Sequence, residues 1–345
     1  MDLYFAGTLN DECRDYMEKV GANKLFSYIN DRTQIEDLIE RKKRGTYKGK
    51  LLVDSGAFSA FTKGKQVNLD EYIAWINKVS PWVDYFIALD IIPGEGVDNV
   101  AVAEGGYKNY VYMLQNVNCP EKIWPVHHAS DPDEYLYRIL STEIQPGVLV
   151  PYICLGGLVG TNASILPFLQ SMEHKISKSC NPDVKVHALG VTSIPTLSSV
   201  SFTSCDSAAW IFSASTGNIM TPWGSLLVSD KATADPQHIL NLPEHRRKIY
   251  EEYISSMGFN LESLMTRYQD RMNINIKYLM DTFSSMTHKK VRFRKKVSEG
   301  AIKQVEPQEC VVPAVPLQVT IEKPVRPAVN IQTECVVETV DKDSI

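Results

Sequence analysis

The sequence predicts a (β/α)8 TIM barrel followed by a C-terminal helical appendage and a disordered tail. Eight short apolar runs, rich in β-branched and aromatic residues, recur between residues 3 and 207, and segments with helical spacing lie between them. Alternating strands and helices are typical of a parallel sheet, and the number of runs favours closure into a barrel. A doubly wound open sheet is the alternative, because periodicity does not decide whether a sheet closes.

The expected strands and helices follow from the spacing of apolar residues. The strand candidates are LYFAG (3–7), KLFSYI (24–29), KLLVDSG (50–56), DYFIALDII (84–92), KIWPVHH (122–128), VLVPYICLGG (148–157), VKVHALGV (184–191) and SFTSCDS (201–207). The helix candidates between them include RTQIEDLIERKK, NLDEYIAWINKV, DPDEYLYRIL and NASILPFLQSMEHKI. Residues 236–286 carry apolar residues three and four positions apart, which indicates further helices.

The chain is therefore expected to have three parts. Residues 1–235 form the barrel, 236–299 a helical appendage with a basic end, and 300–345 the tail. The last 46 residues contain five prolines, no aromatic residue, and seven acids against four bases, a composition typical of disorder. An extended segment that adds a strand to the sheet of a protein partner is the alternative for this tail.

Composition excludes several classes of protein. No stretch approaches the length of an apolar membrane span, and the first residues lack the pattern of a signal peptide, so we expect a cytoplasmic protein with no membrane partner. None of the seven cysteines forms a CxxC pair, which argues against a disulfide framework or a cysteine-rich zinc site. We expect no metal and no cofactor, and the sequence leaves a homodimer open.

Polar residues and glycines gather where the apolar runs end, and in a barrel these ends share the face that holds the active site. They are Asp54, Asp90, His127, His128, Gly156, Gly157 and Cys205-Asp206-Ser207. Each has a structural alternative: Asp54 could form a turn, and Asp206 could cap a following helix. Adjacent strand residues point to opposite faces, so only one of the two histidines can reach a shared centre.

Two carboxylates in one pocket suggest chemistry at an acetal-like carbon, where one attacks and the other handles protons. A metal-dependent barrel hydrolase is the alternative. Such an enzyme normally uses two or three His, Asp or Glu ligands at strand ends, often as an HxH pair, and the sequence has no such pair. A barrel that has lost catalysis and only binds nucleic acid or protein is a further alternative.

Four segments resemble the tRNA-guanine transglycosylase superfamily. DSGAFS resembles the DSGG(F/Y)Q segment of these enzymes, LGGLVG resembles their IGGL segment, HALGV resembles a strand ending in (M/L)GVG, and SCDSAAW occupies the place of their late aspartate. The segments occur in the same order over residues 50–210. The zinc motif CxCxxC of the tRNA enzymes is absent after Cys205. The chain is therefore more similar to the phage and bacterial DNA 7-deazaguanine transglycosylases than to the tRNA-acting enzymes. This resemblance implies a role in DNA modification and restriction evasion.

The resemblance implies a role for each matching residue. Asp206 would be the nucleophile at C1′ of a deoxyguanosine, Asp54 the general acid/base, and Asp90 the acceptor for the donor groups of the purine. The incoming base would be a 7-deazaguanine such as preQ0. The base pocket would be completed by Ser55, Gly56, Phe58, His127 or His128, Gly156, Gly157 and Leu189. A tRNA-guanine transglycosylase is the nearest alternative.

Two basic runs are expected to contact phosphates, because Lys and Arg neutralise the nucleic-acid backbone. A solvated helix end is the alternative for both. The residues are Arg246, Arg247 and Lys248 in the first run, and Lys289, Lys290, Arg292, Arg294, Lys295 and Lys296 in the second.

Overall fold

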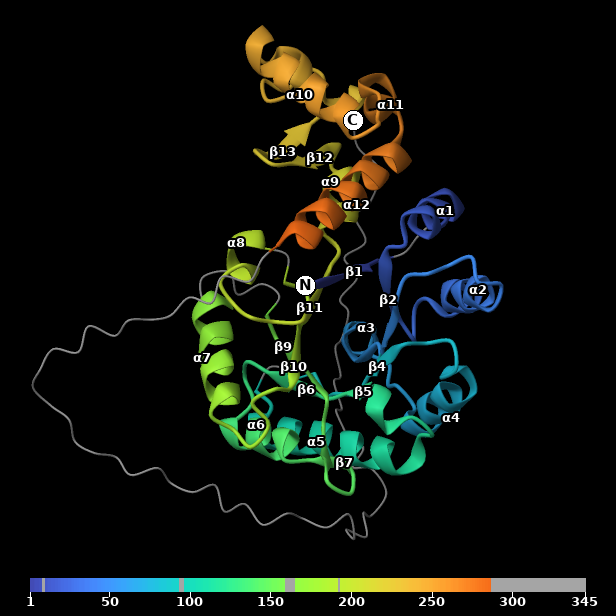
Figure 1. The fold of residues 1–345 in the computed structure, drawn as a ribbon, viewed down its shortest axis with the longest axis vertical. Helices are drawn as coiled ribbons and strands as arrows, with labels where there is room; N and C mark the ends of the chain where they lie inside the picture. The colour runs from blue at the N-terminus through green and yellow to red at the C-terminus, as the bar shows by residue number, and fades with distance from the viewer. Residues whose placement is uncertain (8–9, 93–95, 159–164, 192, 287–345) are drawn as a thin grey trace, which may run out of the picture.

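A parallel sheet of nine strands forms the centre of the computed structural model, which describes residues 1–7, 10–92, 96–158, 165–191 and 193–286 (Figure 1). The strand order is β5-β4-β3-β2-β1-β11-β10-β9-β6. The strands are β1 (Asp2–Ala6), β2 (Asn23–Ser27), β3 (Leu51–Asp54), β4 (Tyr85–Ile87), β5 (Ile123–Trp124), β6 (Val126–His128), β9 (Tyr152–Gly156), β10 (Lys185–Ala188) and β11 (Ser204–Ser207). Every expected apolar run contributes to this sheet.

The sheet is nearly closed into a barrel, because only Pro125 separates its two edge strands. β5 pairs with β4 and β6 pairs with β9, so the run 122–128 bridges the two ends of the sheet. Pro125 lacks an N–H group and interrupts the strand, but its carbonyl oxygen accepts a hydrogen bond from the Cys154 amide at 2.8 Å. In a doubly wound open sheet the edge strands would lie far apart, so the barrel-like prediction is the better one.

Two expected strands differ from the sequence prediction. The run 84–92 is a strand only at β4, so Asp90 lies in the loop after it. The first part of the run 148–157 forms β8 (Val148–Leu149), which pairs antiparallel with β7 (Glu143–Gln145) outside the main sheet. Both differences occur beside glycine, proline or loop residues, where apolar spacing does not mark the ends of a strand.

Helices surround the strands (Figure 1). The longer ones are α1 (Asp11–Val20), α2 (Arg32–Lys43), α4 (Leu69–Val79), α5 (Asn99–Asn116), α6 (Asp133–Leu140) and α7 (Ile165–Ser177). Shorter helices α3 (Ala57–Thr62), α8 (Ile194–Leu197) and α9 (Ala209–Ser215) follow β3, β10 and β11. Side-chain caps from Asn10, Asn68 and Asp98 accept amide hydrogen bonds at the start of α1, α4 and α5. No described helix is long and apolar enough to cross a membrane.

Alternation along the strands divides the core into two layers. Leu3 and Phe5 belong to the large cluster between the sheet and the helices, whereas Tyr4 belongs to a smaller cluster inside the sheet. The interior cluster consists of Tyr4, Leu52, Ile87, Trp124, Tyr152 and Cys154. Side chains therefore fill the middle of the barrel, and only the residues at the strand ends can form a site.

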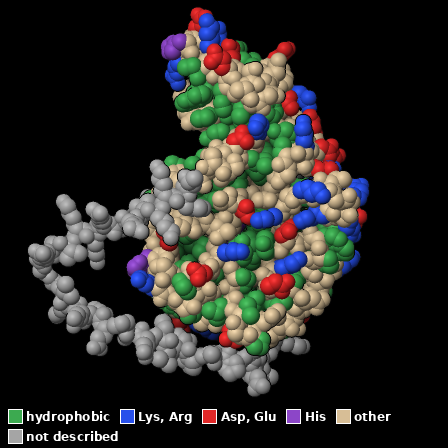
Figure 2. All heavy atoms as spheres, viewed as in Figure 1, with side chains coloured by type: hydrophobic (Ala, Val, Ile, Leu, Met, Phe, Trp, Pro, Cys, Tyr) green, Lys and Arg blue, Asp and Glu red, His purple; other side chains and the backbone are tan. Residues whose placement is uncertain are grey.

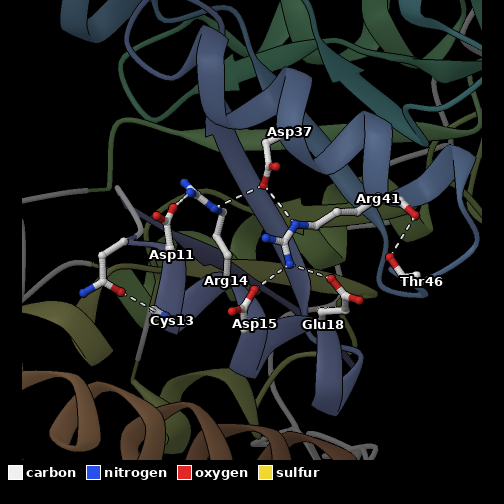
Figure 3. Close-up of polar contacts among 9 residues, drawn as sticks. Asp11, Cys13, Arg14, Asp15, Glu18, Asp37, Arg41 and Thr46 are labelled. Atoms are coloured by element: carbon white, nitrogen blue, oxygen red, sulfur yellow. Dashed lines mark hydrogen bonds and ion pairs between the residues drawn. The ribbon is translucent and has the colours of Figure 1, made fainter.

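Charged side chains join neighbouring outer helices. Arg41 of α2 donates from Nη1 to Asp15 at 2.7 Å and to Glu18 at 2.6 Å, both on α1 (Figure 3). Its Nε atom also donates to Asp37 at 3.0 Å, and Arg14 of α1 contacts the same carboxylate at 3.2 Å. Because one guanidinium binds three carboxylates, this network aligns α1 and α2 more effectively than isolated surface pairs would.

A smaller lobe follows the barrel strands. It contains the hairpin β12 (Asn218–Thr221) and β13 (Gly224–Leu227) and the helices α10 (Glu244–Ser256), α11 (Leu261–Thr266) and α12 (Tyr268–Ser285). Ile274 of α12 belongs to the core of this lobe, but Met272 and Ile276 belong to the large core of the barrel. Helix α12 therefore contributes to both cores, and the boundary at residue 235 stays a prediction. The expected tail 300–345 lies outside the described residues.

Candidate functional site

Three aspartates lie at the carboxyl ends of strands around the mouth of the barrel. Asp54 is the last residue of β3, Asp206 lies in β11, and Asp90 follows β4 by three residues. Asp54 is two residues after the inward-facing Leu52, so its side chain also points inward. The charges of Asp90 and Asp206 both act on Asp54, which places the three carboxylates in one electrostatic environment.

Asp54 is the carboxylate most suited to holding a proton. Burial, the charge of Asp90 and, more weakly, that of Asp206 raise the pKa of Asp54 to about 7, although the amides of Gly56 and Ser55 oppose this shift. Its Oδ2 atom accepts from the Gly56 amide at 3.0 Å, so Asp54 also forms the strand-end turn that was its structural alternative. Gly56 adopts a left-handed conformation with φ of 81° there.

Two nitrogen atoms lie within hydrogen-bonding distance of the Asp206 side chain. Its Oδ1 atom accepts from the Gly190 amide at 2.8 Å and lies 3.3 Å from Nε2 of His187. The following helix begins at Ala209, and no N-terminal amide of that helix is bonded to the Asp206 side chain. Asp206 is therefore not a helix cap, and its hydrogen bonds fix a carboxylate at the mouth instead.

Asp90 forms an ion pair with a histidine. Its Oδ2 atom lies 2.9 Å from Nε2 of His128, and Asp131 approaches the other ring nitrogen at 3.6 Å. Burial lowers the pKa of His128, but the contacts with Asp131 and Asp90 outweigh it and raise the pKa to about 10. His128 is therefore an imidazolium at neutral pH, and its contact with Asp90 fixes the orientation of that carboxylate.

His127 lies beside the same Asp131 but has no described contact with Asp90. It lies one residue before His128 on β6, is buried, and has its Nδ1 atom 3.8 Å from Asp131. Burial lowers the pKa of His127 to about 4, so this ring is neutral at physiological pH. Of the two histidines expected to contact the base, His128 is the one that contacts a mouth carboxylate.

The remaining predicted residues fall into three groups. Ser55 is fully buried beside Asp54, and Leu189 packs against the interior cluster. Phe58 is 62% exposed on α3, so it does not line the floor of a pocket, although it remains available for stacking. Of the basic runs, Arg246, Arg247 and Lys248 lie on α10, and the six residues from Lys289 to Lys296 lie outside the described residues.

Three further residues, which were not predicted from the sequence, complete the site. They are His187 and Gly190, which contact Asp206, and Ser204, whose Oγ atom lies 2.8 Å from Nδ1 of His187. A signal was available, because His187 is two residues before Leu189 and must share its face of the strand. Ser204 is likewise two residues before Asp206 on β11, so the two side chains share one face of that strand.

Comparisons with known protein families and curated proteins found no match. Within the residues that the structure describes, no group of three or more His, Cys, Asp or Glu side chains is arranged to hold a metal ion. The geometry of the mouth is therefore the main basis for a functional proposal.

Gly156 provides the space that His128 occupies. A Cβ atom at position 156 would lie 2.9 Å from Cδ2 and 3.3 Å from Nε2 of the His128 ring. We expect Gly156→Ala to displace the ring from Asp90 and to lower the free energy of unfolding by about 1–3 kcal/mol. Urea unfolding monitored by circular dichroism measures this loss.

Gly106→Ala is the matched control, because an added Cβ on α5 would meet nothing closer than 3.8 Å. Alanine is the better helix former, so this variant should gain about 0.5–1 kcal/mol. Equal stability of the Gly156→Ala protein and the unmodified protein would show that His128 does not depend on the glycine.

Proposed function

We propose that the protein is a base-exchange transglycosylase that replaces guanine in DNA with a 7-deazaguanine base such as preQ0. The observation that carries the proposal is that the three carboxylates at the mouth have different hydrogen-bond partners. Asp206 and Asp90 each have a histidine partner, whereas Asp54 receives hydrogen bonds only from backbone amides among the described residues and has a pKa near 7. One carboxylate is thus suited to attack, one to recognition, and one to proton transfer.

We interpret the nearly closed sheet as a (β/α)8 barrel whose fifth strand is interrupted at Pro125. Counting β5 and β6 as one strand gives eight, each followed by a helix in the described residues. In barrels of this kind the active site lies at the carboxyl ends of the strands, where Asp54 and Asp206 are found. The four sequence segments that resemble the transglycosylases supply these same strand ends.

In the proposed first step, Asp206 attacks C1′ of the target nucleotide. A bond forms between a carboxylate oxygen and C1′ while the bond from C1′ to N9 of guanine breaks, and its electron pair stays on the base. Asp54 gives its proton to the departing guanine. The products are a glycosyl ester on Asp206, free guanine, and an ionised Asp54.

The second step reverses these roles with a new base. Asp54 removes the proton from N9 of the incoming 7-deazaguanine, whose nitrogen attacks C1′ and displaces the Asp206 carboxylate. A proton carrier with a pKa near the working pH can serve in both directions. Asp90, oriented by His128, would accept from the N1–H and 2-amino groups of either base.

The lobe supplies candidate contacts for the nucleic-acid backbone. Arg246 and Lys248 are exposed on α10, and Lys248 is paired with Glu244. Figure 2 shows basic and acidic side chains together at the tip of the lobe, beside hydrophobic ones. Trp223 of this lobe is 57% exposed and is held edge-on by Tyr250 and Tyr253, an arrangement suited to stacking on a base.

Incubation with labelled preQ0 or guanine tests the proposed function. The full chain is mixed with labelled base and either guanine-containing DNA or tRNA, and label retained in the polymer is counted. Label in DNA supports the proposal, and label in tRNA alone would assign the protein to the tRNA-acting branch. If neither polymer takes up label with either base, the protein is not a transglycosylase of this kind.

Removing the basic side chains of α10 should weaken DNA binding in a salt-dependent manner. Each phosphate contact contributes about 0.9 to the slope of log affinity against log salt concentration, so Arg246→Ala combined with Lys248→Ala should lower the slope by about 1–2. Fluorescence anisotropy with single-stranded DNA at several salt concentrations measures it. Lys78→Ala, which removes an exposed charge from α4, should leave the slope unchanged. If the double variant and the unmodified protein gave identical slopes, Arg246 and Lys248 of α10 would not contact the DNA.

A further inference from the structure

The two oxygens of Asp206 have different surroundings. Oδ1 accepts from the Gly190 amide at 2.8 Å and lies 3.3 Å from Nε2 of His187. Both groups belong to β10 and the turn that follows it, and no described residue is bonded to Oδ2. The Gly190 amide withdraws electron density from Oδ1 and the His187 ring crowds it, so Oδ2 is the better nucleophile.

His187 is fixed in the floor of the mouth. Its side chain is fully buried and lies against the rings of Tyr4 and Trp124, with centroid distances of 5.8 and 5.4 Å. Tyr4 packs edge-on to Trp124, so the walls around the imidazole are themselves held in place. The ring has no space in which to turn away from Asp206.

Ser204 determines which nitrogen of His187 carries the proton. A neutral imidazole has one N–H donor, and the Nδ1 atom lies 2.8 Å from the Ser204 hydroxyl. If Nδ1 carried the proton, the lone pair of Nε2 would face the Asp206 carboxylate and repel it. If Ser204 donates to Nδ1, Nε2 carries the proton and donates to Asp206, and every group has a partner.

We propose that His187 is a positioning residue for Asp206, kept in its Nε2–H tautomer by Ser204, and that Oδ2 is the oxygen that attacks C1′. This inference rests on the proposed function and extends it. In the glycosyl ester, Oδ1 becomes the carbonyl oxygen and Oδ2 is bonded to C1′. When the incoming base attacks C1′, the bond from C1′ to Oδ2 breaks and its electron pair returns to the carboxylate.

The two steps should depend on His187 to different degrees. Donors on Oδ1 stabilise the carboxylate, so they help it to leave in the second step but give no such help to its attack in the first. Loss of the His187 donor should therefore slow release of the sugar by on the order of 10²-fold, the effect of removing one donor from a developing oxyanion. Ester formation should change by less than about 10-fold, so the covalent adduct should accumulate.

A pair of substitutions separates the N–H group from the packing of the ring. His187→Leu fills the space without a donor, whereas the amide of His187→Gln reaches a position close to Nε2 and can still donate to Oδ1. In single-turnover reactions followed on denaturing gels, the Leu variant should accumulate adduct, and the Gln variant should release it within about 10-fold of the unmodified rate. Thermal melting of both variants checks that they are folded.

The inference is overturned if the Leu variant releases the sugar at the normal rate, if it slows both steps equally, or if the Gln variant is as slow as the Leu variant. Nitrogen-15 NMR of the histidine rings provides a measurement independent of catalysis: Nε2–H is expected at His187, and Nδ1–H would contradict the tautomer. If the unmodified protein forms no adduct with DNA or tRNA, the proposed function fails, while the NMR measurement still decides whether His187 donates to Asp206.

Discussion

Replacing Asp206 with Asn is expected to abolish base exchange and the covalent adduct. The amide keeps the size of the carboxylate and can still accept from Gly190 and His187 through its carbonyl oxygen. It is a far weaker nucleophile at C1′, so the rate of exchange should fall by on the order of 10⁴-fold or more. Loss of labelled preQ0 incorporation, and of the slowly migrating DNA band on a denaturing gel, measures the effect.

Asp133→Asn serves as the control for this experiment. Asp133 is a half-exposed carboxylate at the start of α6 that pairs with Lys175 of α7, and no described contact joins it to Asp54, Asp90 or Asp206. It should exchange bases at the rate of the unmodified protein. Persistence of the adduct in Asp206→Asn would transfer the nucleophilic role to another mouth carboxylate, and Asp54 would be the first to examine.

Much of the fold could be predicted because the sheet is parallel and covered by helices. In such a sheet each strand is a nearly continuous apolar run, and all eight runs supply a strand. The break at Pro125 could not be placed, because a proline inside an apolar run fits an edge strand as well as an interrupted one. The double role of α12 was also not predictable, because its apolar residues surround much of the helix.

The site was predictable where a charged residue ended an apolar run. Asp54 and Asp206 stand out from the sequence for this reason, and both lie at the mouth. His187 was less conspicuous, because one histidine in an apolar strand is usually a core residue. Lys24 was not foreseen at all: it is fully buried on β2 and donates to the Phe5 carbonyl at 2.7 Å and to the Gly7 carbonyl. The sequence could not predict this role, because the need of the Phe5 and Gly7 carbonyls for a donor becomes visible only in the folded structure.

Replacing Asp54 with Asn is expected to make the protein more stable at pH 8 while removing its activity. The pKa of Asp54 rises from 3.8 to about 7 on folding, chiefly because of burial. Above pH 4 the unfolded chain holds this carboxyl ionised, whereas the folded protein keeps it protonated up to about pH 7. The free energy of unfolding therefore falls as pH rises from about 4 to 7, by at most about 4 kcal/mol.

An amide at position 54 is neutral at every pH, as the protonated acid is, so it avoids the cost of burying the charge. Asp54→Asn and the unmodified protein should have equal stability near pH 4, and the variant should be more stable by up to about 4 kcal/mol at pH 8. Burial lowers the pKa of Lys24 to about 7, but this residue is common to both proteins and cancels in the comparison.

The same substitution removes the group that carries the proton to and from the base. Exchange should fall by about 10²- to 10⁴-fold, the usual contribution of a general acid/base. Urea unfolding at pH 4.5, 6 and 8, together with incorporation of labelled base, measures both effects, and Asp133→Asn should change neither. A variant less stable than the unmodified protein at pH 8 would mean that the ionised Asp54 is favourably paired. Proton transfer would then have to be assigned to another group.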